Sequence, residues 1–299
     1  MQDGLDERIQ RHMLEHGFRA APTAEALAQR LHDHAIDVAL GDFLASEATP
    51  QRVVGIMGSA AMRRDDRWYR AAAQLGRLLA RAGYLVVTGG GPGVMEAGNL
   101  GAFLAPQHDA GVLDAALDEL ARAPAYAPDS GNEEYVRAAS LVRERNLPGG
   151  TSLAIPTWFY PGEPVGQFAS HIAKYFANSI REDGLLSIAV SGIVYLPGRA
   201  GTTQELFQDA AQNAYGIRGR SPMVLLGREV YDGDPSIYAL LCDQARRFGG
   251  YDQLVGLCDD PAEAVAFIQA HEPTEAEEAL TGTSREILEY VRNERVRAS

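Results

Sequence analysis

The feature that most constrains the fold is a regular alternation of short apolar segments with helical patterns. Apolar positions in residues 66–83 trace one helical face, and Gly83 is a natural stop for that helix. The apolar segments are nearly continuous, as is typical of strands buried on both faces. They lie at 52–57, 84–88, 151–155, 192–196 and 222–226. The pattern predicts an α/β fold with a Rossmann-like, doubly wound parallel sheet and helices on both faces.

Helical segments flank the predicted sheet domain, which we place at residues 51–270. Residues 1–50 are predicted to form an N-terminal helical extension, and residues 271–299 a charged C-terminal helix. An amphipathic helix is expected over 27–46 within the extension. Its HDH triplet, residues 32–34, resembles a metal-binding pair, but residues two apart point away from each other on a helix. We therefore interpret the triplet as a solvated face.

An insertion interrupts the alternation at residues 106–148. It contains two helical pieces separated by a break rich in Pro, Ala and Gly near 123–131. The plain interpretation is a surface insertion, and only the length of the segment favours a lid or an oligomer contact.

The charge balance excludes two classes of partner. The 299 residues include 27 basic and 40 acidic side chains, a formal net charge of -13, whereas nucleic acids and anionic membranes attract basic surfaces. Cys242 and Cys258 have neither CxxC spacing nor an accompanying histidine pair, which argues against a zinc site or a disulfide framework. No secretory leader pattern is present, and no apolar run approaches the ~18 residues of a membrane span. We expect a cytoplasmic protein.

Two glycine turns follow predicted strands, and the first contains Gly89, Gly90, Gly91 and Gly93. Glycines let the backbone approach a ligand closely, and a helix starting near residue 93 would direct its amides at an anion. The turn does not fit the dinucleotide fingerprint, because Glu96 stands at the third glycine position, and no Gly-Lys-Ser/Thr of a Walker A loop follows. A mononucleotide phosphate cradle and a purely structural turn both remain open.

The second turn, LPGRAGTTQE at 196–205, precedes a helical pattern that ends at Gly216. Gly198 and Gly201 allow a tight reversal, so the amides of residues 199–203 can converge on one anion. Thr202 and Glu205 have the spacing of a capping box, which alone favours a capping role for Glu205. Both turns should lie at the carboxyl edge of the same sheet, where open α/β folds bind ligands. That placement favours a chemical role for the carboxylate.

With both turns in view, the sequence resembles the Lonely Guy family of nucleoside 5'-monophosphate phosphoribohydrolases, long labelled lysine decarboxylases. The matching motifs are GGGPGVME (89–96), PGRAGTTQE (197–205) and GIMGSA (55–60), and the resemblance covers residues 52–260. The family's catalytic arginine corresponds to Arg181. Two departures stand out: Arg199 replaces the second glycine of the family's PGG, and IRED replaces its usual RK.

The resemblance implies hydrolysis of the N-glycosidic bond of an AMP-like nucleoside 5'-monophosphate to a free base and ribose 5-phosphate. It implies that Glu205 and Arg181 are catalytic, that no metal or cofactor takes part, and that the protein is a homodimer or a higher even oligomer. The residues implied in phosphate binding are Gly58, Ser59, Gly89, Gly90, Gly91, Gly93, Met95, Gly198, Arg199, Ala200, Gly201 and Thr202.

Two other function classes remain as hypotheses. One is a non-catalytic carrier of a nucleotide or phosphorylated cofactor that keeps the phosphate cradle without hydrolysis. The other is a ligand sensor in which residues 106–148 respond to binding. A retained arginine and glutamate favour the enzyme, because binding alone needs the backbone amides more than the acid.

Overall fold

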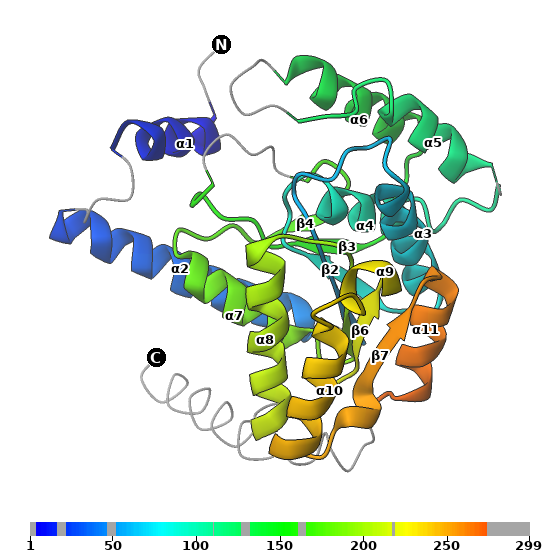
Figure 1. Cartoon of the computed structure of the whole chain (residues 1–299). Helices are drawn as coiled ribbons and strands as arrows, with labels where there is room; N and C mark the ends of the chain where they lie inside the picture. Colours follow the sequence, from blue (N-terminus) through cyan, green and yellow to red (C-terminus); the bar gives the residue numbers. More distant parts are fainter. Residues whose placement is uncertain are drawn as a thin grey trace.

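A parallel sheet of seven strands forms the centre of the computed structural model, which describes residues 4–16, 22–46, 52–109, 111–126, 132–160, 166–216 and 219–273 (Figure 1). The strands are β1 (Val53–Met57), β2 (Leu85–Thr88), β3 (Ser152–Ala154), β4 (His171–Ile172), β5 (Gly192–Tyr195), β6 (Met223–Leu226) and β7 (Val255–Cys258). All of the pairings are parallel. The predicted α/β fold class is confirmed.

The strand order β4-β3-β2-β1-β5-β6-β7 gives the sheet a switch point between β1 and β5. From β1 the chain winds outward through β2, β3 and β4, and from β5 it winds the other way through β6 and β7. In β1, Gly55 is in register with Val87 of β2 and Ile193 of β5. Ligands of open α/β sheets bind outside the carboxyl ends of the strands at such a switch point.

Helices cover both faces of the sheet because alternate strand residues point to opposite sides. On one face Val54 and Ile56 pack under α3 (Arg67–Arg81), α4 (Val94–Phe103) and α11 (Pro261–Ala270). The insertion helices α5 (Val112–Leu120) and α6 (Glu133–Arg145) add to this layer from outside. On the other face Val53 and Met57 pack under α7 (Asn178–Ile188), α8 (Ala200–Tyr215) and α10 (Ile237–Phe248). The short α9 (Arg228–Tyr231) and the 3-10 helix η1 (Asp252–Leu254) complete this part.

Two helix ends follow the sequence signals closely. The carboxylate of Asp66 accepts the Trp68 N–H at 2.8 Å at the start of α3, and Gly83, with φ of 85°, lies just beyond its end. Gly216 ends α8 in the left-handed conformation, with φ of 60°.

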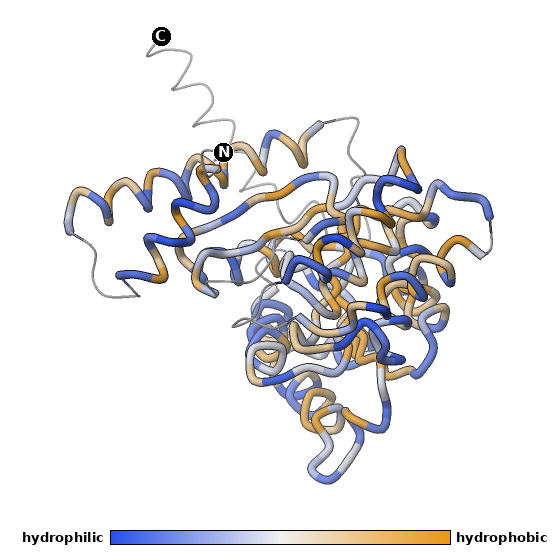
Figure 2. Tube along the Cα trace, turned by 90° about the horizontal axis from the view of Figure 1, so that it is seen from above, coloured by the Kyte–Doolittle hydropathy of each residue, from blue (hydrophilic) through white to orange (hydrophobic). Residues whose placement is uncertain are grey.

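The amino-terminal helices α1 (Leu5–His16) and α2 (Thr23–Leu44) extend to one side of the sheet domain, with polar and apolar residues along their length (Figures 1 and 2). The interpretation of residues 32–34 as a solvated face is wrong for Asp33, which is 1% exposed because α2 packs that side chain against the start of α7. The helix predicted for 271–299 falls almost entirely beyond residue 273, outside the described residues.

Candidate functional site

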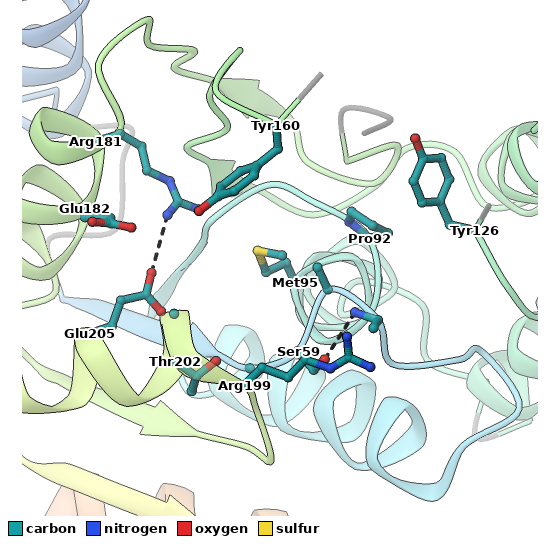
Figure 3. A pocket seen from close by; sticks show the side chains of 14 residues that line it. Ser59, Pro92, Met95, Tyr126, Tyr160, Arg181, Glu182, Arg199, Thr202 and Glu205 are labelled. Carbon is teal, nitrogen blue, oxygen red and sulfur yellow. Dashed lines mark hydrogen bonds and ion pairs between the residues drawn. The ribbon is translucent and has the colours of Figure 1, made fainter. Parts of the chain in front are cut away.

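A pocket of about 620 Å³ opens at the carboxyl ends of β1 and β5, the switch point of the sheet (Figure 3). Arg181 and Glu205 lie at one end, Tyr126 stands across from them, and Ser59 and Arg199 lie between the two ends. The pocket is lined by Gly58, Ser59, Ala60, Ala61, Pro92, Met95, Tyr126, Tyr160, Arg181, Glu182, Arg199, Gly201, Thr202 and Glu205.

Three acceptors fix the guanidinium of Arg181, which projects from the first turns of α7. Its Nε donates to the Ile155 carbonyl oxygen at 2.8 Å, and its Nη2 donates to that of Gly89 at 3.0 Å. Its Nη1 lies 3.3 Å from Oε1 of Glu205. A Cβ at position 89 would lie 2.0 Å from Nη2. A residue without a side chain is therefore required at position 89 for the guanidinium to occupy this position.

Glu205 lies in the second turn of α8, so the capping-box interpretation is wrong. The helix begins at Ala200 with Arg199 as its N-cap residue, which places Thr202 and Glu205 both inside the helix. The Glu205 side chain is 12% exposed. Burial raises the pKa of its carboxyl group, the positive charge of Arg181 opposes that rise, and the nearby Glu182 adds to it.

The amino terminus of α8 forms the anion-attracting part of the pocket. The first amides of a helix have no intrahelical acceptor, and the helix dipole favours negative charge beside them. Apart from neighbouring residues of its own helix, no atom of the described part of the chain lies within 4 Å of the Cβ position of Gly201, so the backbone there is open to the pocket. Arg199 adds a positive charge on exposed, extended backbone with φ of -113° and ψ of -161°.

The first glycine turn lies behind the pocket and packs against other parts of the chain. Gly93 is the N-cap residue of α4 and has a φ of 70°, and a Cβ there would lie 2.3 Å from the Ser59 carbonyl oxygen. From this turn and α4, Pro92 and Met95 reach the lining. Gly89, Gly90, Gly91 and Gly93 are buried and do not line the pocket, nor do Gly198 and Ala200 of the second turn.

Sequence reasoning assigned no role to six lining residues, which are Ala60, Ala61, Pro92, Tyr126, Tyr160 and Glu182. Ala60, Pro92 and Glu182 directly adjoin predicted site residues and Ala61 lies two positions from Ser59, so their positions beside the motifs were a usable signal. Tyr126 follows α5 in the insertion and Tyr160 follows β3, far from any motif. The topology brings these two tyrosines to the pocket, and no local pattern marks them.

The acid at the third glycine position, Glu96, belongs to a buried polar hub. Arg64 donates two hydrogen bonds to the Glu96 carboxylate, at 2.6 and 2.9 Å. Oε2 of Glu96 also accepts the hydroxyl groups of Tyr69 at 2.8 Å and Tyr135 at 2.7 Å. Because Tyr135 is in α6, the hub fastens the insertion to α3 and α4.

The described residues contain neither a membrane-spanning helix nor a cluster of metal ligands. None of the helices described is long and apolar enough to cross a membrane. Within the same residues, no group of three or more His, Cys, Asp and Glu side chains could hold a metal ion.

Fold and pocket together define a doubly wound α/β protein with a ligand pocket at the switch point of its sheet. Residues 51–127 match the model of the SLOG cluster4 family. That segment, about a quarter of the chain, holds the first two turns of the pocket region but not PGRAGTTQE. No curated protein matches the chain.

Solved structures with a similar fold include two proteins described by their molybdenum cofactor. The molybdenum cofactor binding protein of the phototrophic bacterium Rippkaea orientalis is 15% identical with a TM-score of 0.46, covering 75% of this chain and 98% of its own. The molybdenum cofactor carrier protein of Chlamydomonas reinhardtii is 18% identical with a TM-score of 0.43, covering 74% and 97%. TM1055 is 19% identical with a TM-score of 0.41, covering 74% and 99%.

Proposed function

We propose that this protein is a nucleoside 5'-monophosphate phosphoribohydrolase related to the Lonely Guy family, which hydrolyses the N-glycosidic bond to a free base and ribose 5-phosphate. The observation that carries the proposal is the Arg181–Glu205 pair at one end of a pocket that also contains the amino terminus of α8. This arrangement supplies a carboxylate for the sugar and dipoles for the phosphate in one pocket of about 620 Å³.

Glu205 performs the chemistry. Cleavage builds oxocarbenium character on the ribose, and a carboxylate beside the anomeric carbon stabilises that charge and accepts a proton from the attacking water. Burial raises the pKa of Glu205 toward the range in which a general base works best. The charge of Arg181 keeps the carboxylate ionised, and its fixed guanidinium orients both the carboxylate and the ribose hydroxyls.

The 5'-phosphate binds at the start of α8. The amides of Gly201 and Thr202 and the guanidinium of Arg199 face the anion, and Ser59 of the β1 turn adds a hydroxyl group. Binding energy from this remote group holds the ribose against Glu205 and is available to distort it. Nucleoside 5'-monophosphates should therefore react far faster than the corresponding nucleosides.

A chromatographic assay tests the proposal directly. The purified protein is incubated with a panel of purine and pyrimidine nucleoside 5'-monophosphates, with the nucleosides as controls, and free base and ribose 5-phosphate are quantified. We expect equimolar products from at least one monophosphate. Binding without turnover across the whole panel would refute the hydrolase and favour a carrier or sensor.

A Glu205→Gln variant identifies the catalytic group. The amide keeps the size of the side chain and loses the base, so turnover should fall by about 10²–10⁴-fold. The matched control is Asp183→Asn, because Asp183 accepts hydrogen bonds from Gln208 and Gln212 between the same two helices but lies outside the pocket. The control should retain wild-type turnover, and an active Glu205→Gln protein would overturn the assignment.

A further inference from the structure

The amino-terminal extension reaches the candidate site through a buried carboxylate. Asp33 of α2 is 1% exposed, and its two carboxylate oxygens accept the backbone N–H groups of Phe176 and Ala177, each at 2.9 Å. Phe176 and Ala177 immediately precede α7, the helix that carries Arg181. From a different part of the chain, Asp33 therefore holds the N-cap residue of α7 and the residue before it.

The contact with Asp33 compensates for the absence of a side-chain cap within the described residues of α7 itself. Its N-cap residue is Ala177, and none of the described side chains of its own first turn caps it. The N–H groups at a helix start need acceptors from outside the helix, and a carboxylate beside them is favoured by the helix dipole. Asp33 supplies an acceptor for the N–H of the N-cap residue Ala177, a second acceptor for Phe176, and a negative charge at this end of the helix.

Two further acids of the extension hold the chain segment that leads into α7. Asp37 accepts the hydroxyl group of Tyr175 at 2.9 Å. Asp6 of α1 accepts the indole N–H of Trp158 at 2.8 Å and pairs with Lys174 at 2.6 Å. The extension is thus fastened to the segment between β3 and α7 at three separate points.

The connection from Asp33 to the pocket runs through one residue. Ala177 donates its N–H to Asp33, and its carbonyl oxygen accepts the N–H of Arg181 at 3.1 Å. This bond is in the first turn of α7. The position of Ala177 therefore determines where along the helix axis the backbone of Arg181 lies. The guanidinium then has to meet the Ile155 and Gly89 carbonyl oxygens and Glu205 together.

We infer that Asp33 is a positioning residue for Arg181. The amino-terminal extension thereby contributes to the geometry of the site. The inference rests on the proposed function for its kinetic consequence, and on geometry alone for its structural one. Loss of the Asp33 carboxylate releases the start of α7 and shifts the guanidinium away from Glu205.

The test compares Asp33→Asn with Asp37→Asn, which removes a carboxylate one turn further along α2 that bonds Tyr175 but no amide of α7. Kinetics are measured with AMP, or with the best monophosphate of the panel, well below the unfolding temperature of each variant. An asparagine presents an NH₂ group to one of the two amides, so kcat should fall about tenfold to a hundredfold while KM changes little. Asp37→Asn should stay close to wild type.

The pH profile separates positioning from simple destabilisation. The groups that act on the Glu205 carboxyl are Arg181 and Glu182 of α7 together with burial, and Arg181 alone among them lowers its pKa. When the guanidinium moves away from Glu205, the pKa of that carboxyl group rises. The acid limb of the kcat/KM profile should therefore move to higher pH in Asp33→Asn and not in Asp37→Asn. A loss of rate that only follows the folded fraction, with the limb unmoved, would overturn the inference.

Hydrogen exchange tests the inference even if the wild type shows no turnover. The absence of turnover would refute the proposed function but not the role of Asp33. Asp33→Asn should then still raise amide exchange in peptides covering residues 176–182 relative to both wild type and Asp37→Asn. Equal protection in the three proteins would refute the role of Asp33 independently of any activity.

Discussion

Arg199 stands where the resembling family has glycine, and its conformation explains why a side chain fits. The backbone there is extended, and no glycine-specific conformation is required. The guanidinium lies beside the open amides of α8, on the lining of the pocket. At the scale of one residue, the substitution replaces a position without a side chain by one that carries a positive charge.

Replacing Arg199 with glycine should weaken phosphate binding. A charge-assisted hydrogen bond contributes ~1.5–3 kcal/mol, so KM for the monophosphate should rise about tenfold or more with little change in kcat. Initial rates at two salt concentrations provide the measurement. Arg199→Lys is the control and should recover part of the affinity. An unchanged KM in Arg199→Gly would place the phosphate elsewhere in the pocket.

A second residue-scale prediction concerns Asp209, which lies one turn after Glu205 on α8. Burial raises the pKa of this carboxyl group to about 7, although the hydrogen bond from Tyr195 opposes the rise. The folded protein therefore holds a proton that the unfolded chain releases near the ordinary value of 3.8. The free energy of unfolding should fall as pH rises from about 4 to about 7, by up to ~1.4 kcal/mol per pH unit from this group.

Urea unfolding between pH 4 and 8 tests the role of Asp209. In Asp209→Asn this contribution is absent, so the difference between wild type and variant should shrink or reverse as pH rises toward 7. Parallel curves for the two proteins would show that folding does not shift the pKa of Asp209 and would contradict the prediction.

At the scale of elements, the Arg64–Glu96 hub decides how firmly the insertion is held. Glu96→Gln leaves the buried guanidinium of Arg64 without its counter-charge, which should cost on the order of 3–5 kcal/mol of folding free energy. Equilibrium urea unfolding measures the loss. Asp114→Asn is the control, because its pair with Arg70 is exposed and should contribute no more than ~1 kcal/mol. Similar costs for both variants would contradict the hub.

The sequence was most informative where an element is long or fully buried. Five strands were predicted because their apolar runs are continuous and fully buried. The two edge strands β4 and β7 were not predicted: both residues of β4 are exposed, and β7 is only partly buried at one of its four positions. The capping-box hypothesis failed because α8 starts three residues before the position that the motif suggested. No local pattern indicates where a helix begins within PGRAGTT.

The candidate site was predictable at its motifs and not between them. Ser59, Arg181 and Glu205 line one pocket, as the two turns and the strand order together require. Tyr126 and Tyr160 reach the same pocket from distant loops. Gly89, Gly90 and Gly93 of the first turn face protein atoms. This depends on how neighbouring segments pack, so the spacing of the glycines in the sequence could not predict it.

For the whole molecule, the family resemblance predicts a homodimer or a higher even oligomer. Light scattering coupled to size-exclusion chromatography at micromolar concentration measures the mass directly. We expect a mass that is an even multiple of the 32.2 kDa chain. A monomer under these conditions would contradict the prediction while leaving the pocket assignment intact.

The pairing of Lys174 with Asp6 makes docking of the extension chemically observable. Lys174 is the single lysine of the sequence, its side chain is 12% exposed, and its ammonium lies 4.8 Å from the centre of the Trp158 ring. An amine-reactive label should therefore acylate this side chain slowly while α1 stays in place and quickly once it detaches. Mass spectrometry of the peptide that contains Lys174 then measures the rate at which the amino-terminal helices open, with no engineered probe.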